Sequence, residues 1–214
     1  MQLSFAENFD GQKLNTDVWE PVGNGPRRTG WWRPDAHYLD GKGNLVIKIF
    51  KDGDKYITGG IQTKSKFRFS YGYYEARVKI QTQPGAWSAF WLWPFDSSAP
   101  DAVEIDIFEY GFVPNAPQYA LHWYQGGHTK SIVHIPYLNP AANWHTFSFY
   151  WDKDSMIWYM DGRTVRKVAT NGYKGDTTII LSAEIGKEAF GNIKEAKLPD
   201  YYLVDWVKYW KPVK

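Results

Sequence analysis

Three acidic residues lie within six positions of the apolar segment VEIDIFEYG (103–111): Glu104, Asp106 and Glu109. Successive side chains of a β-strand point to opposite faces, so Glu104 and Asp106 share one face. Glu109 is five residues from Glu104 and would point to the other face of a regular strand. The chemistry that these carboxyl groups can perform together therefore depends on whether the strand is regular.

Three interpretations suit the cluster. A solvent-exposed strand face can carry acids without function, but the rest of this segment is apolar, and like charges two positions apart repel. Carboxylate clusters also bind Ca²⁺ or Mg²⁺, although calcium loops are usually irregular and rich in Gly, Asp and Asn. The third interpretation is a pair of carboxyl groups that hydrolyses a glycosidic bond.

The hydrolytic interpretation requires an irregular strand. A β-bulge at Ile107–Phe108 would return Glu109 to the face of Glu104 and Asp106. Four strand steps, roughly 13 Å, would then separate the Cα atoms of the two glutamates. Side chains that lean toward each other would bring the carboxyl groups to about 5 Å, as in retaining glycosidases (about 5–5.5 Å) and unlike inverting ones (about 6.5–9.5 Å). We therefore predict a bulge here.

Electrostatics would separate the roles of the two glutamates. One carboxylate must stay ionised to attack the anomeric carbon, and the other must stay protonated to give the leaving oxygen its proton. Like charges that lie close together raise one of the two pKa values. Asp106 would lie between them and could hydrogen-bond the nucleophile.

The segments around this cluster read almost entirely as strands, because they are rich in β-branched and aromatic residues. Many strands, short turns and no long amphipathic helix predict an all-β fold of two packed antiparallel sheets. Asp161-Gly162 is expected to be the turn of a hairpin over 156–168, and 186–200 could hold one short helical turn at most. The other predicted strands cover 45–51, 72–82, 86–94, 118–125, 130–137, 145–152, 177–186 and 201–210.

Aromatic residues are unusually frequent: 12 Trp, 15 Tyr and 12 Phe make up 18% of the chain. The segment AWSAFWLWP (86–94) carries Trp87, Trp91 and Trp93 on one face and Phe90 and Leu92 on the other. A strand with one face on the core and the other in water should alternate apolar and polar side chains. Both faces of this strand are apolar, so its second face must meet something other than bulk water. An aromatic-lined groove would satisfy this, and aromatic faces stack well on the C–H faces of sugars.

Composition excludes several other partners and sites. The formal net charge is +2, and the longest basic cluster is Arg27-Arg28, so we expect no nucleic-acid binding. No apolar stretch is long enough to span a bilayer, and the absence of Cys excludes disulfides and thiolate metal sites. The first ten residues lack the pattern of a signal peptide, so either the protein is not exported or its signal is missing from this sequence.

The hexapeptide EIDIFE (104–109) resembles the active-site signature of glycoside hydrolase family 16: Glu, aliphatic, Asp, aliphatic, an optional hydrophobic residue, Glu. Phe108 fills the optional hydrophobic position. In this the chain resembles the bulged branch of the family, which includes laminarinases, agarases and carrageenases, whereas strict lichenases lack the extra residue. Further segments resemble the family, in family order and over nearly the whole chain: FAENFDG, GGIQTKSKFRFSYGYYEARVKI, PGAWSAFWLWP and YLVDWVKYW.

The resemblance implies a β-jelly-roll sandwich, similar to concanavalin A, with residues 1–214 as a single catalytic domain and a cleft on its concave sheet. It also implies net retention of configuration. By the family motif Glu104 would be the nucleophile, Glu109 the acid/base and Asp106 the helper.

Other residues match family positions. Arg77 could instead be a surface residue, His122 a core histidine, and one of Trp87 and Trp91 part of the core. The positions implied for substrate binding are Asn24, Trp31, Trp32, Arg77, Trp87, Trp91, His122, Ser182 and Glu184. A structural Ca²⁺ is implied on the convex side at Glu7, Gly43 and Asp205, the first two through main-chain carbonyls.

Two positions depart from the family pattern. Ser182 stands where laminarinase-like members have Asn, and Glu184 where they have a small apolar residue. An extra carboxylate in the cleft would change which sugar hydroxyls are recognised, and it argues against sulfated galactans. We expect a secreted or cell-surface monomer that acts on a polysaccharide, with β-1,3-glucan or mixed-linkage β-1,3-1,4-glucan favoured. A β-galactan hydrolase, a transglycosylase and a non-catalytic carbohydrate-binding sandwich are the alternatives.

Overall fold

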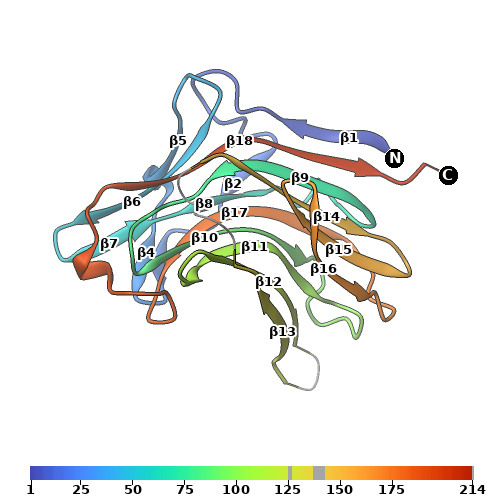
Figure 1. Cartoon of the computed structure of the whole chain (residues 1–214). Coiled ribbons are helices and arrows are strands. Elements are labelled where there is room, and N and C mark those ends of the chain that lie inside the picture. The colour runs from blue at the N-terminus through green and yellow to red at the C-terminus, as the bar shows by residue number, and fades with distance from the viewer. Residues whose placement is uncertain (125–126, 137–142, 214) are drawn as a thin grey trace.

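The computed structural model describes residues 1–124, 127–136 and 143–213. In these residues two bent β-sheets pack face to face (Figure 1). The ends of two predicted strands, Gln125 and Tyr137, lie outside the described residues. The all-β sandwich that the sequence predicts is confirmed.

The larger sheet has 11 strands in the described residues, and the smaller has seven. The larger one runs β16 (Arg163–Ala169), β15 (Ser155–Met160), β14 (His145–Trp151), β9 (Gly72–Lys79), β18 (Asp200–Lys211), β6 (Leu45–Asp52), β7 (Lys55–Thr58), β4 (Gly30–Trp32), β3 (Gly25–Arg27), with β1 (Gln2–Glu7) beside β18 and β5 (His37–Leu39) beside β6. The smaller one runs β13 (Thr129–His134), β12 (Ala116–Trp123), β11 (Glu104–Val113), β10 (Ala86–Pro94), β17 (Thr177–Ile185), β8 (Gly60–Thr63), β2 (Trp19–Pro21).

One pairing departs from the antiparallel prediction. Strand β4 pairs with β7 in parallel, with Trp31 opposite Ile57. A parallel pairing needs a long connection, and η1 (Pro34–Ala36), β5 and β6 supply it here. Every other strand pairing of the two sheets in the described residues is antiparallel, as predicted.

The helical content of the described residues is small. It comprises the single turns η1 and η3 (Ile193–Glu195), and η3 is the one short turn expected within 186–200. Neither turn approaches the length or the apolar character of a membrane-spanning helix. The β15–β16 turn has positive φ at Asp161 (50°) and Gly162 (74°), which is the backbone that a two-residue hairpin turn requires.

The core lies between the sheets. Phe147, Phe149 and Trp151 of β14 are fully buried, as their alternation predicts. From the facing sheet Phe108 stacks on Phe147, with 4.1 Å between ring centroids. The indole Nε1 of Trp158 donates a hydrogen bond of 2.9 Å to the main-chain carbonyl of Asp106. These contacts hold β11 against the larger sheet and fix its position.

Candidate active site

The predicted bulge is present in β11. Phe90 of β10 pairs with Phe108, and the next residue, Trp91, pairs with Asp106, so Ile107 is an extra residue on β11. Ile107 and Phe108 are both fully buried in the core. Because two consecutive residues point into the core, Glu109 returns to the face of Asp106. The three acids therefore line one hollow on the outer face of the seven-stranded sheet.

Small residues leave space around the acids. Ala89 of β10 lies opposite Glu109 on one side and opposite Ser182 of β17 on the other. On the far side of β11, Ala120 of β12 lies opposite Asp106. Larger side chains at these three positions would fill the centre of the sheet face.

The carboxyl group of Glu109 is suited to hold a proton. Burial raises its pKa well above the usual range, and the nearby charge of Asp106 raises it further. The side-chain amide of Gln118 donates a hydrogen bond of 2.5 Å to Glu109 Oε2 and opposes this rise. A protonated carboxyl group in a groove is what a general acid requires.

Glu104 has a different environment. Burial raises its pKa above the usual value, and a hydrogen bond from the Tyr124 hydroxyl and the nearby His122 oppose this rise in part. Asp106 is almost fully buried, and its pKa lies well above the usual range because of burial and the charge of Glu104. Glu104 thus has partners that stabilise its ionised form, whereas Asp106 and Glu109 are held toward the protonated form.

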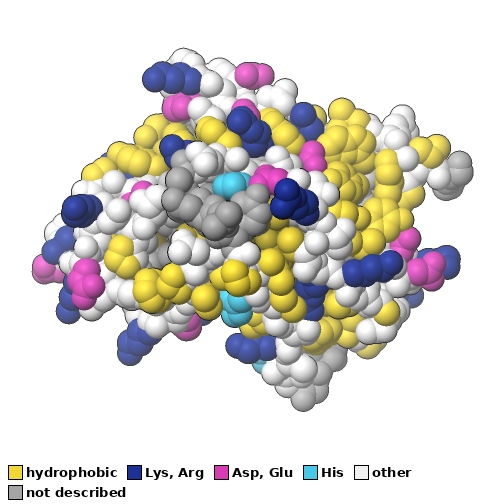
Figure 2. Space-filling view, viewed as in Figure 1, with side chains coloured by type: hydrophobic (Ala, Val, Ile, Leu, Met, Phe, Trp, Pro, Cys, Tyr) yellow, Lys and Arg dark blue, Asp and Glu magenta, His cyan; other side chains and the backbone are white. Residues whose placement is uncertain are grey.

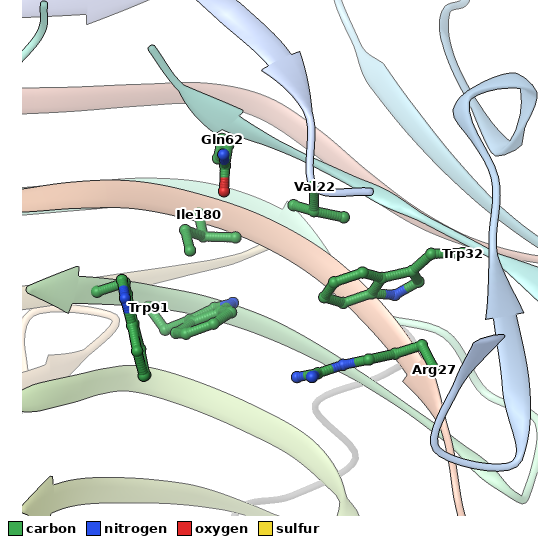
Figure 3. A pocket seen from close by; sticks show the side chains of 7 residues that line it. Val22, Arg27, Trp32, Gln62, Trp91 and Ile180 are labelled. Carbon is green, nitrogen blue, oxygen red and sulfur yellow. The ribbon is translucent and has the colours of Figure 1, made fainter. Parts of the chain in front are cut away.

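The acids lie in the narrow middle of a longer groove. On one side Arg27, Trp32, Trp91 and Trp93 line a hollow of about 240 Å³. Figure 3 shows Arg27 and Trp32 reaching from the β3–β4 hairpin toward Trp91. On the other side a hollow of about 310 Å³ has the following residues among its lining: Arg28, Glu104, Glu109, Gln118, His122, Tyr124 and His128. Residues shared between adjacent hollows make them one groove.

The family model for glycosyl hydrolases family 16 matches residues 28–206. The chain belongs to this family. The resemblance that the EIDIFE signature carries is therefore confirmed.

The relatives of this family 16 chain include glucanases. It is 29% identical to glucan endo-1,3-beta-glucosidase A1 of Niallia circulans over 200 residues, which cover 78% of this chain and 29% of that protein. It is 31% identical to endo-1,3-1,4-beta-glycanase EglC of Rhizobium meliloti, over 64% of this chain and 29% of that protein. The chain thus spans less than a third of the length of these two relatives.

Solved structures show the same fold over the whole chain. The laminarinase catalytic domain of Thermotoga maritima superimposes with a TM-score of 0.85 at 21% identity, covering 100% of this chain and 99% of that one. Laminarinase from Flavobacterium sp. UMI-01 superimposes with a TM-score of 0.83 at 25% identity, covering 98% of this chain and 100% of that one. The β-jelly-roll sandwich implied by the resemblance is confirmed.

Several predicted residues of this family 16 chain lie in the groove. Trp91 donates a hydrogen bond of 3.0 Å from Nε1 to Ser182 Oγ, and Trp32 donates one of 2.9 Å to the carbonyl of Ala183. His122 Nε2 lies 3.2 Å from Asp106 Oδ2, and His122 Nδ1 lies 2.9 Å from His128 Nε2. Trp91 and Trp32 keep partly exposed rings, so they can contact a ligand.

Arg77 does not lie in the groove, so the prediction of a cleft arginine was wrong. It lies on β9 of the other sheet, between the buried Ala76 and Val78, and therefore points outward. There its guanidinium pairs with Asp205 and stacks over the ring of Trp144 at 4.8 Å. The alternative interpretation, a surface arginine, is the one that the structure supports.

Two further predicted residues do not line the three hollows of the groove. Asn24 is exposed just before β3. Trp31 points away from Trp32, and Lys55 Nζ lies 3.9 Å from the centroid of its ring. The alternation of β4 explains this, because only one of two adjacent strand residues can face the groove.

The structure also brings in residues that the sequence analysis did not select: Tyr124, Gln118, His128, Trp93, Arg27 and Arg28. A signal existed for some of them. Gln118 and Tyr124 are each an even number of residues from His122, so they lie on its face of the strand, and Trp93 lies on the face of Trp91 for the same reason. Arg27 and Arg28 gave no such signal, because their place depends on how the β3–β4 hairpin packs against β17.

The calcium prediction is not tested and stays a prediction. Both carboxylate oxygens of Glu7 accept hydrogen bonds, from Phe9 N and Trp19 Nε1, and Asp205 is paired with Arg77. The Asp205 carboxylate fits a calcium site poorly as it stands, because the guanidinium of Arg77 already neutralises it. Within the described residues, the acids and histidine whose ligand atoms lie within 4.8 Å of one another are Glu104, Asp106 and His122.

Proposed function

We propose that the chain is a retaining endo-β-glycanase that hydrolyses β-1,3-glucan or mixed-linkage β-1,3-1,4-glucan. The observation that carries the proposal is the bulge at Ile107, which brings Glu104, Asp106 and Glu109 to one face inside a groove. A lectin-like module would need the aromatic groove but not two half-buried glutamates with raised pKa values. The name of the Niallia circulans relative, a glucan endo-1,3-beta-glucosidase, supports the choice of glucan, and the name of EglC supports the β-1,3-1,4 linkages.

Glu104 acts as the nucleophile in this proposal. Its ionised carboxylate attacks the anomeric carbon while Glu109 gives its proton to the leaving oxygen, so that a covalent glycosyl–enzyme forms. Glu109, now ionised, takes a proton from water, and the resulting hydroxide displaces Glu104 from the sugar. The second inversion restores the original configuration and returns both carboxyl groups to their starting states.

Asp106 and Tyr124 assist Glu104. Burial and the charge of Glu104 raise the pKa of Asp106, which favours its protonated form, and a protonated Asp106 can donate a hydrogen bond to the nucleophile. Tyr124 donates a second hydrogen bond to Oε2 of Glu104. These bonds orient the carboxylate and stabilise it as the departing group of the second step.

We also propose that the protein acts as a monomer outside the cell or on its surface. A long polysaccharide cannot enter a cell, so an enzyme that cuts within the chain must meet it outside. Lys and Arg side chains lie scattered over the face shown in Figure 2 and form no continuous basic patch there. This distribution agrees with a neutral polymer as the partner.

The test is reducing-sugar release from laminarin, barley β-glucan, lichenan, agarose, arabinogalactan and xyloglucan. Wild type is compared with Glu104→Gln, which keeps the shape of the side chain but cannot attack. We expect release from a glucan by wild type and its loss in the variant. Activity confined to a galactan would overturn the substrate, and binding without any release would favour a non-catalytic module.

A further inference from the structure

Glu184 is held between two consecutive arginines of the β3–β4 hairpin, Arg27 at the end of β3 and Arg28 in the turn. Its Oε1 accepts hydrogen bonds from Arg27 Nε (3.1 Å) and Arg27 Nη2 (2.7 Å), and its Oε2 accepts one from Arg28 Nε. The side chain of Glu184 is only 6% exposed, whereas those of Arg27 and Arg28 are 38% and 41% exposed. The carboxylate therefore anchors the turn from below and is not free to bind a sugar.

Arg28 covers the ring of Trp87. Its Cζ lies 4.9 Å from the ring centroid, and Phe112 packs on the same indole at 4.9 Å between centroids. Trp87 lines the groove next to the acids, yet it is only 2% exposed. A guanidinium thus occupies the surface that a sugar would need in order to stack on Trp87.

The position of Arg28 is fixed on several sides. Glu184 is the cross-strand neighbour of Trp87, so the same pair of strands holds both the anchor and the ring. Arg28 Nη1 lies 3.4 Å from Glu188 Oε1, which adds a second acidic partner. The bond to the buried carboxylate is charge-assisted, so moving Arg28 would remove one of the two cationic partners of Glu184.

Arg28 lies between the small hollow around the acids and one of the larger hollows, because it lines both. The hollow around the acids measures about 30 Å³, against about 240 Å³ and about 310 Å³ on its two sides. A glycan that passes between the two wide parts must cross the narrow part beside Arg27 and Arg28. A side branch on the sugar in this place would collide with the guanidinium of Arg28.

We propose that Arg28, positioned by Glu184, is a specificity-determining wall that closes the stacking face of Trp87 and restricts the catalytic centre to unbranched glycan. This inference rests on the proposed glycanase function. Glu184 acts through Arg28 and is a positioning residue. The departure from the family pattern at Glu184 is thereby explained, because this carboxylate holds Arg28 in place.

The experiment compares kcat/KM for linear β-1,3-glucan and for β-1,3-glucan with β-1,6-linked branches. Wild type is compared with Arg28→Ala, Glu184→Gln and the control Arg68→Ala. Arg68 also pairs with an acid, Asp176, and stacks over an aromatic ring, Phe95, but it does not line the groove. We expect Arg28→Ala to raise the branched-to-linear ratio about tenfold, Glu184→Gln to raise it less, and Arg68→Ala to leave it unchanged.

A second readout does not depend on turnover. Acrylamide quenching of tryptophan fluorescence should increase in Arg28→Ala, and Trp87→Phe should remove the increase. Affinities for the same two glucans, measured on the Glu104→Gln background with and without Arg28→Ala, should show the same change in ratio.

The outcomes separate the two proposals. An unchanged branched-to-linear ratio of kcat/KM in folded Arg28→Ala, or an equal loss of kcat/KM on both glucans, would contradict the proposal that Arg28 excludes branches. A wild type that releases no sugar from either glucan would contradict the glycanase function instead. In that case the affinity ratio still decides whether Arg28 excludes branches.

Discussion

The hydroxyl of Tyr124 donates a hydrogen bond to the carboxylate of Glu104, although Tyr124 lies beyond β12 and Glu104 begins β11. This bond favours the ionised form of Glu104 and opposes the effect of burial on its pKa. The acid that we assign as nucleophile thus has a partner for its ionised form in a residue outside the EIDIFE signature, although burial still leaves its pKa raised.

Tyr124→Phe should impair activity most at low pH. Loss of the hydrogen bond raises the pKa of Glu104, so its ionised form disappears at a higher pH than in wild type. We expect the acid limb of the kcat/KM profile to move to higher pH and kcat/KM at neutral pH to fall about tenfold. Tyr38→Phe is the control, because Tyr38 is exposed on β5. An unchanged acid limb would contradict the role of Tyr124.

Glu109→Gln should abolish hydrolysis and yet stabilise the fold at neutral pH. The folded-state pKa of Glu109 is raised, so ionisation is costly in the folded state but not in the unfolded one. Below the unfolded value, about 4.3, the acid is protonated in both states and costs nothing. As pH rises from the unfolded-state pKa toward the folded-state pKa of Glu109, the free energy of unfolding of wild type falls, whereas that of Glu109→Gln does not.

Urea unfolding at several pH values measures this effect. We expect Glu109→Gln to exceed wild type by at least about 1 kcal/mol at pH 7 and to match it near pH 4. A variant that is less stable than wild type at pH 7 would show that the carboxyl group is not strained by burial.

Phe108→Ala should destabilise the whole sandwich. Phe108 follows Ile107, the extra residue of the β11 bulge, is fully buried, and stacks on Phe147 of the other sheet. Loss of a buried phenyl group costs about 3–5 kcal/mol, which urea unfolding would detect. Tyr201→Ala, at an exposed position of β18, should cost far less. A cost below that of the control would mean that the bulge does not depend on this contact.

Calcium should compete with Arg77 for Asp205. Because the guanidinium already neutralises this carboxylate, we expect calcium to raise the melting temperature of wild type by less than about 2 °C over EDTA. Arg77→Ala frees the carboxylate and should increase the calcium response. A large response in wild type that Arg77→Ala does not enlarge would show that Arg77 is no competitor.

The sequence by itself determined the strands and the place of the three acids. Alternation in β14 predicted which aromatic residues enter the core, and Asp161-Gly162 predicted the hairpin turn. The odd spacing between Asp106 and Glu109 predicted the bulge, because only an extra residue places all three acids on one face. These features are local, and a period-2 pattern together with turn chemistry is sufficient to predict them.

Tertiary structure decided which polar groups meet. Glu184 is far from Arg27 and Arg28 in the sequence, and only the packing of the β3–β4 hairpin against β17 brings them together. Arg77 pairs with Asp205 because of the register between β9 and β18. The partner of a charged side chain depends on such long-range registers, which nothing in the neighbouring residues encodes. For this reason the sequence located the acids but not the wall beside them.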